Sequence, residues 1–268
     1  MTALVGGRFR PFGPQHLVIL GLFGLVCLAT VLFVRRLSPR AEATLRRTAG
    51  VVILVVCGPF EVVDWLHAVG NWRTSLPVQI CDFAWLIAGV ALLTGNRRWS
   101  AVLYYWGLTL SLQGVLTPDL NHVFPDPQFF GYWVRHLAPV WAAVYLIGAR
   151  AGPSWRDYRF VLALTALWAA AMMGLNAVLG SNYGYLNAKP VSHSLLDLFG
   201  PWPWYVVVEA VLIVGGWALI TWPWTHGRAN EDGMNHRDQR GLATEESRSR
   251  PQPHLMNRWV HSRMRMKM

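Results

Sequence analysis

The stretch S-L-P-V-Q-I-C-D-F-A-W, residues 75–85, decides how we interpret the rest of the chain. It opens a hydrophobic segment long enough to cross a bilayer, yet it carries Gln79, Cys81 and Asp82 in its first turns. Pro77 suits the first turn of a helix, where a missing N–H costs nothing. A thiol and a carboxylate are costly to bury at the border of a membrane, so the stretch predicts that they have a role there.

The composition extends this interpretation to the whole chain. Its 268 residues are 53% hydrophobic and only 14% charged, with a positive mean hydropathy. Soluble domains contain about 25% charged residues, and here the charges are missing from long runs. Many of the 15 Trp residues lie at the ends of these runs, as in the aromatic belts of membrane proteins. The sequence therefore predicts a polytopic membrane protein.

Seven hydrophobic segments come near the ~20 residues that a bilayer requires. They cover residues 15–34, 48–69, 77–94, 100–117, 129–149, 159–180 and 204–222. The first lacks a small-residue cleavage site, so we expect it to be a retained helix and not a signal peptide. We predict an all-α, seven-helix transmembrane bundle in residues 1–224, followed by a disordered basic tail in residues 225–268.

Arginine residues alternate between the predicted loops. The loops at 35–47, 95–99 and 150–159 are rich in Arg, as is the tail, whereas the intervening loops carry few positive charges. The positive-inside rule then predicts a multi-pass protein of the bacterial plasma membrane, with the N-terminus outside and the C-terminus in the cytoplasm.

The formal net charge of +10 would also suit a nucleic-acid-binding protein. Such a protein concentrates its positive charges on one compact domain, whereas here they lie in loops and the tail. We therefore expect membrane lipids, and no nucleic acid, as partners. The oligomeric state stays open.

Polar residues gather at the predicted outer ends of the segments. Each charge at a bilayer centre costs on the order of 3 kcal/mol, so several on one side favour a shared, partly hydrated cavity that opens outward. The residues expected to line this cavity are Glu61, Asp64, Cys81, Asp82, Gln113, Arg135, His136 and Asn182.

These residues have two interpretations, both of which stay open. Glu61 and Asp64 are three residues apart on one helical face, and either pair with Arg135 to hold helices together or handle a ligand or protons. Cys81 and His136 are either a nucleophile and its base, or a small buried thiol and a structural imidazole.

If the protein is an enzyme, we expect thiol-dependent acyl transfer or hydrolysis on a lipid-like substrate. Cys81 would be the nucleophile and His136 the base, Asp82 or Asp64 would orient the imidazole, and Arg135 would hold a phosphate or carboxylate.

In that enzyme, Glu61, Asp64, Gln113 and Asn182 would complete the substrate site. The alternative is a non-catalytic small-solute carrier, sensor or membrane assembly partner with a charge network of Glu61, Asp64 and Arg135. No metal or cofactor is expected, because the three Cys residues match no metal-site spacing and nucleotide fingerprints are missing.

Three stretches resemble the bacterial YwaF-like family of integral membrane proteins. They are L-P-V-Q-I-C-D-F-A (76–84), Y-W-G-L with Q-G-V-L-T-P-D-L (105–120) and the His of Y-W-V-R-H (132–136), and N-Y-G-Y-L-N-A-K-P with S-L-L-D-L-F-G-P-W-P-W-Y (182–205). The resemblance covers about residues 15–222 and implies seven helices, while the activity of that family is not established.

A more distant resemblance is to eukaryotic transmembrane acyltransferases of the ether-phospholipid type. In those enzymes a membrane Cys is the proposed acyl carrier. The resemblance implies this role for Cys81, with His136 two segments further along the chain.

Overall fold

The computed structural model describes residues 9–71, 73, 76–189 and 195–249 of the chain. These residues form helices and loops and contain no strand, so the predicted all-α class is confirmed. The long helices are α1 (Pro14–Val34), α2 (Pro39–Ala68), α3 (Ile80–Thr94), α6 (Pro127–Gly148), α7 (Trp155–Leu179) and α8 (Trp204–Ser249).

The fourth predicted segment is a continuous helical rod made of three parts. They are α4 (Arg97–Tyr105), the π-helical η1 (Trp106–Ser111) and α5 (Leu112–Leu116). Each of the seven predicted segments therefore corresponds to one rod. Two short 3₁₀ turns, η2 (Tyr183–Tyr185) and η3 (Leu195–Phe199), lie between α7 and α8.

The helices begin and end at residues suited to those positions. Proline occupies the first turn of α1, α2 and α6, where its missing N–H is harmless. Gly95 follows α3 with φ 66° and Gly180 follows α7 with φ 63°, and glycine adopts this left-handed conformation without steric cost.

Within the described part of the chain, four helices are long and apolar enough to cross a membrane: α1, α2 up to Leu66, α7, and residues Trp204–His226 of α8. Their apolar side chains are largely exposed; Leu25 of α1 is 64% exposed, for example. Such surfaces are unfavourable in water and suit a lipid environment. The other three rods are shorter or carry more polar residues.

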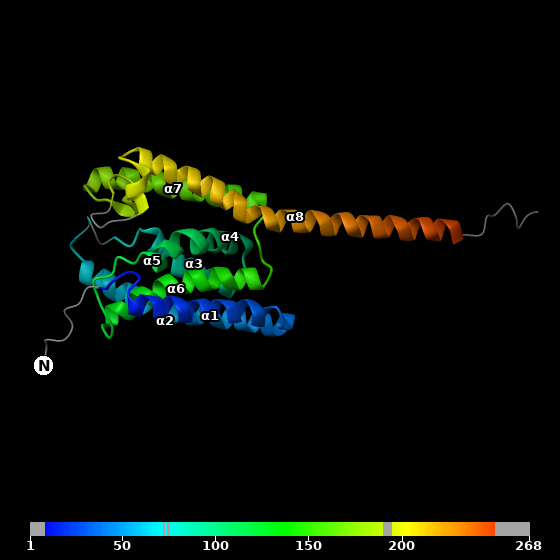
Figure 1. Ribbon diagram of the computed structural model, residues 1–268, viewed down its shortest axis with the longest axis horizontal. Helices are drawn as coiled ribbons and strands as arrows, with labels where there is room; N and C mark the ends of the chain where they lie inside the picture. Colours follow the sequence, from blue (N-terminus) through cyan, green and yellow to red (C-terminus); the bar gives the residue numbers. More distant parts are fainter. Residues whose placement is uncertain (1–8, 72, 74–75, 190–194, 250–268) are drawn as a thin grey trace, which may run out of the picture. The chain divides into compact units, whose positions relative to one another are not determined.

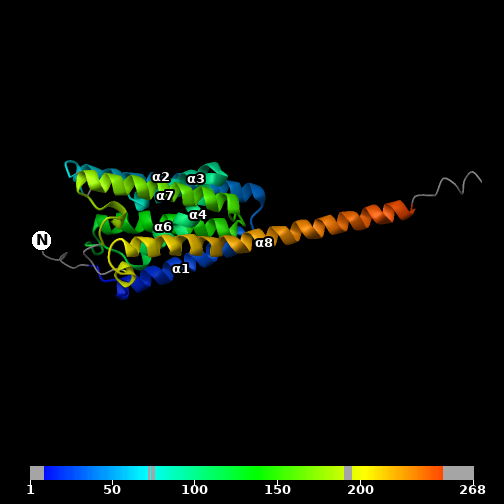
Figure 2. The same cartoon turned by 90° about the horizontal axis from the view of Figure 1, so that it is seen from above.

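Helix α3 is short but central, because it packs against α2, α4 and α6. Ala88 and Leu92 of α3 are fully buried. Glycines bring α2 and α3 close together, since a Cβ atom on Gly50 would lie 2.6 Å from the backbone nitrogen of Leu93. Figures 1 and 2 show the helices of residues 9–221 running alongside one another.

The chain divides into two compact units between Thr221 and Trp222, within α8. We predict disorder from residue 225 onward, but the backbone is helical as far as Ser249. Residues 228–249 include four Arg and three Glu residues, two residue types that favour helices. Residues 250–268 of the predicted tail lie outside the described residues.

Candidate functional site

Cys81 is the second residue of α3 and lies within a capping box. The backbone nitrogen of Gln79 donates to Oδ2 of Asp82 at 2.9 Å, and the Gln79 side chain accepts from the Asp82 backbone. The first backbone N–H groups of a helix have no partner inside it, and the positive end of the helix dipole lies there. The half-buried thiol therefore lies at the N-terminal end of α3.

The backbone just before α3 is held in place by α7 and the turn that follows it. The Leu76 nitrogen donates to the Tyr183 hydroxyl at 2.8 Å, and the Trp168 indole donates to the Val78 carbonyl at 2.9 Å. Tyr183 is fixed in turn by the buried Asn176, which bonds to both its backbone nitrogen and its carbonyl. Residues distant in sequence thus position Cys81.

Arg135 of α6 forms ion pairs with two carboxylates of α2. One of its terminal nitrogens donates to Oε2 of Glu61 at 2.8 Å, and the other donates to Asp64. Its Nε donates to the Gly131 carbonyl at 3.1 Å. The sequence predicts that Arg135 holds a substrate phosphate or carboxylate, but all three of its nitrogens are already engaged by the protein.

The thiol and the carboxylate of α3 lie near this ion-paired group. Both Cys81 and Asp82 are within electrostatic range of Arg135 and Glu61. We call Glu61, Asp64, Cys81, Asp82 and Arg135 the polar cluster. Its members come from α2, α3 and α6.

The imidazole of His136 is held in one tautomer by its own helix. Its Nδ1 lies 2.8 Å from the Tyr132 carbonyl, which can only accept, so Nδ1 carries the proton and Nε2 is left as a base. We expected Asp82 or Asp64 to orient the imidazole. The Tyr132 carbonyl does so instead, because Asp82 caps α3 and Asp64 pairs with Arg135.

Tyr132 is the functional candidate that sequence reasoning missed. Its ring stacks on His136, with the ring centroids 4.0 Å apart, and its hydroxyl donates to the Gly114 carbonyl at 2.8 Å. It also lies within electrostatic range of Cys81, as does Tyr185. The sequence carried one signal, since Tyr132 is four residues before His136 and shares its helical face.

The pairing of Cys81 with His136 stays a prediction. Among the residues that the structure describes, no hydrogen bond joins the thiol to the imidazole. Tyr132 contacts the imidazole directly. Catalytic hydrogen bonds are often long without substrate and shorten when it binds.

Trp85 presents a buried donor one turn beyond Cys81. Its side chain is 8% exposed, and its indole nitrogen has no hydrogen-bond partner within the described part of the chain. Residues four apart share a helical face, so the indole and the thiol lie on the same side of α3. A buried donor without a partner costs about 1–3 kcal/mol, which makes it a candidate for contacting a ligand.

Two predicted substrate-binding residues have other surroundings. The Asn182 side chain bonds to the Ala188 backbone, with its Nδ2 donating at 2.8 Å and its Oδ1 accepting at 3.0 Å, and so stabilises its own turn. Gln113 is exposed and is the second residue of α5. No interaction recorded among the described residues connects Gln113 or Asn182 with Cys81.

The chain was also compared with known proteins. The model of the TMEM164 family matches residues 11–221, which include the polar cluster, Tyr132 and His136. The chain therefore belongs to this family of membrane proteins. Comparisons with curated proteins and with solved structures found no match. The resemblances to the YwaF-like family and to the acyltransferases stay predictions.

Proposed function

We propose that this member of the TMEM164 family is a membrane enzyme that transfers or hydrolyses acyl groups of lipids through Cys81. The observation that carries the proposal is the setting of the thiol. Cys81 occupies the first turn of a fixed, capped helix. A nucleophile needs a fixed position of this kind.

A base for the reaction is available on α6. Because Nδ1 of His136 donates to the Tyr132 carbonyl, Nε2 is free to accept a proton. The buried indole N–H of Trp85 is a donor that a developing carbonyl oxyanion could accept from. The proposal thus assigns three chemical roles: nucleophile to Cys81, base to His136 and hydrogen-bond donor to Trp85.

The proposed reaction has two steps. The sulfur of Cys81 attacks the carbonyl carbon of a lipid ester while its proton passes to Nε2 of His136. The bond between that carbon and the ester oxygen breaks, and the leaving alcohol takes the proton from His136. A second alcohol or water then attacks the thioester, gives its proton to His136, and the proton returns to the sulfur as the thioester bond breaks.

A lipid substrate agrees with the surroundings of α3. Helices α1 and α2 carry many exposed apolar side chains, among them Leu22 and Val55, which suit contact with acyl chains. We further propose that the protein lies in the bacterial plasma membrane with its N-terminus outside, as the arginine-rich loops suggest. The polar cluster would then face the outer leaflet.

Labelling with a phospholipid that carries an alkyne-tagged acyl chain tests the proposal. The full chain, purified in lipid nanodiscs, should acquire a label that neutral hydroxylamine removes, because hydroxylamine cleaves thioesters. The label should disappear in Cys81→Ser and fall about 100-fold or more in His136→Ala. Cys27→Ala is the matched control, since it removes another partly exposed thiol and should keep the label.

Two results would contradict the proposal that the protein is an acyl-transferring or acyl-hydrolysing enzyme. One is wild-type protein without any label, and the other is a label that survives in Cys81→Ser. Measuring the thermal stability of each variant separates the loss of chemistry from the loss of folding.

The engagement of Arg135 favours a second function. All three of its nitrogens bond to α2 or to α6 itself, as expected of a network that fixes helices or responds to protons. The alternative is a non-catalytic carrier, sensor or assembly partner. It would be supported if Cys81→Ser were fully functional in cells while folded variants of Arg135 were not.

A further inference from the structure

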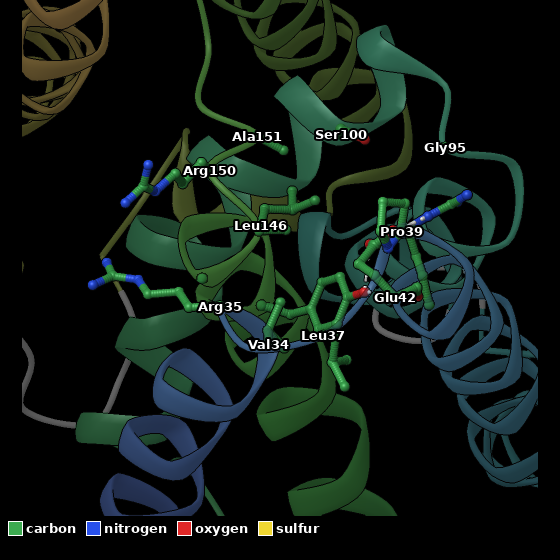
Figure 3. A pocket seen from close by; sticks show the side chains of 14 residues that line it. Val34, Arg35, Leu37, Pro39, Glu42, Gly95, Ser100, Leu146, Arg150 and Ala151 are labelled. Carbon is green, nitrogen blue, oxygen red and sulfur yellow. Dashed lines mark hydrogen bonds and ion pairs between the residues drawn. The ribbon is translucent and has the colours of Figure 1, made fainter.

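A second candidate site lies at the other end of α3 from Cys81. A cavity of about 620 Å³ opens between the end of α1, the start of α2, the residue after α3 and the end of α6 (Figure 3). The 15 residues of α3 span roughly 22 Å, so this cavity is distinct from the polar cluster. The inference drawn from it goes beyond the proposed acyl chemistry and does not depend on it.

Positive charge dominates the cavity, whose lining includes three arginines, Arg35, Arg46 and Arg150, and the single carboxylate Glu42. The carboxylate is already engaged, because Oε1 of Glu42 accepts from the Tyr145 hydroxyl at 2.6 Å and lies 3.7 Å from Nε of Arg46. Arg46 also donates to the Leu92 carbonyl. Glu42 and Arg46 thus form a fixed inner wall.

Arg35 and Arg150 are not held in place in the way that Glu42 and Arg46 are. Both are exposed, and neither side chain makes an ion pair or hydrogen bond with any other described residue. Figure 3 shows them extending on the same side of the cavity. Two guanidinium groups at one rim can hold an anion such as a phosphate through charge-assisted hydrogen bonds.

The backbone of Arg150 supplies an independent observation. Arg150 follows α6 with φ 56°, and the Ala151 nitrogen donates back to the Leu146 carbonyl at 2.9 Å. Glycine normally occupies this position at a helix end, as Gly95 and Gly180 do in this chain. An L-residue costs about 1–2 kcal/mol there, so the presence of arginine points to a use for its side chain.

The depth of the cavity indicates where the anion comes from. Helix α1 has 21 residues and spans roughly 31 Å, close to the ~30 Å of a bilayer's hydrocarbon core. Its last residue, Val34, lines the cavity together with Leu37 and Leu146. Basic rim and apolar wall therefore meet at the level of the lipid headgroups.

We propose that this cavity binds the phosphate of an anionic phospholipid headgroup through Arg35 and Arg150. The glycerol and upper acyl carbons rest against Val34, Leu37 and Leu146. The bound lipid stabilises the region where the end of α1, the start of α2 and the end of α6 meet.

The test compares the full chain in nanodiscs of phosphatidylcholine with and without phosphatidylglycerol. Phosphatidylglycerol should raise the melting temperature of the wild type, because a ligand that binds only the folded state stabilises it. Each of Arg35→Gln and Arg150→Gly should weaken phosphatidylglycerol binding about fivefold. In the double variant Arg35→Gln/Arg150→Gly, phosphatidylglycerol should not raise the melting temperature.

Arg150→Gly keeps the proposal separable from a folding defect. Glycine relieves the strained backbone, so this variant should be at least as stable as the wild type in phosphatidylcholine alone. Arg36→Gln is the matched control, since it removes a neighbouring exposed arginine that does not line the cavity. It should keep the response to phosphatidylglycerol.

Three results would overturn the proposal. The first is a double variant that still responds like the wild type. The second is an equal loss in Arg36→Gln, which would indicate general surface charge. The third is stabilisation by inorganic phosphate in phosphatidylcholine discs that Arg150→Gly abolishes, which would assign the cavity to free phosphate and not to a lipid.

Discussion

Gly114 packs so closely on His136 that a Cβ atom at Gly114 would lie 2.9 Å from Nε2 of the imidazole. Gly114 belongs to α5 and His136 to α6, so this contact fixes the imidazole between two helices. The same glycine accepts the Tyr132 hydroxyl through its carbonyl. The orientation of the proposed base therefore depends on a residue that has no side chain.

Gly114→Ala should displace the imidazole. We expect a loss of about 1–3 kcal/mol in the free energy of unfolding, because the added methyl overpacks the contact. Lipid-dependent labelling of Cys81 should fall about 100-fold, since small displacements of catalytic groups have effects of this size. Gly174→Ala is the control, because a Cβ there meets no atom within 4 Å. Equal stability and equal labelling of Gly114→Ala and Gly174→Ala would contradict the proposal that Gly114 positions the imidazole.

The ion pairs of Arg135 should be mutually dependent. Arg135→Gln leaves Glu61 and Asp64 close together without a counter-charge, and we expect it to cost about 2–3 kcal/mol in unfolding free energy. Adding Glu61→Gln and Asp64→Asn should restore much of this loss, because all the uncompensated charges are then gone. Denaturant unfolding in detergent measures both the loss of stability in Arg135→Gln and its recovery in the triple variant. A triple variant no more stable than the single one would show that the charges do not interact.

The carboxylate of Asp82 should act as a helix cap. Asp82→Ala removes the acceptor for the Gln79 nitrogen, and we expect it to lower stability by about 1 kcal/mol. Asp82→Asn keeps an oxygen in that position and should retain both the stability and the labelling of Cys81. Loss of labelling in a stable Asp82→Asn variant would instead favour a catalytic carboxylate.

Asp126 should make the start of α6 sensitive to acid. Its side chain accepts from the Gln128 backbone nitrogen and from His122, and these bonds hold the pKa of Asp126 below its usual range. A carboxyl with a lowered folded-state pKa stabilises the fold above its unfolded pKa of about 3.9, and this stabilisation is lost as the pH falls through the folded value.

Thermal melting of the wild type and Asp126→Asn measures this contribution. The wild type should melt at a higher temperature than the variant near about pH 6, and the difference should shrink as the pH falls below the unfolded pKa of about 3.9. A difference that stays constant with pH would mean that the charge on Asp126 is irrelevant.

The sequence predicts the helices well because hydropathy and capping patterns are local. The shared face of Glu61 and Asp64 depends only on residues three positions apart. The pairing with Arg135 follows from the cost of a lone charge in a membrane. These features need no knowledge of how the helices pack.

Features that depend on packing were not predictable. The contact of Gly114 with His136 joins two helices, and the left-handed conformation of Arg150 has no sequence signal, because glycine is the usual residue there. The basic cavity was missed for a related reason. Arg35 and Arg150 are in loops whose arginines are already explained by membrane topology.

The proposed enzyme chemistry requires a covalent acyl group on Cys81. Tandem mass spectrometry of the wild-type chain, after incubation with an acyl-labelled phospholipid and digestion without thiol reductant, locates such a group directly. We predict that the acyl mass lies on the peptide containing Cys81 and disappears after neutral hydroxylamine. An unmodified Cys81 in folded protein that has turned over the phospholipid, or an acyl mass confined to Cys27 or Cys57, would contradict the account.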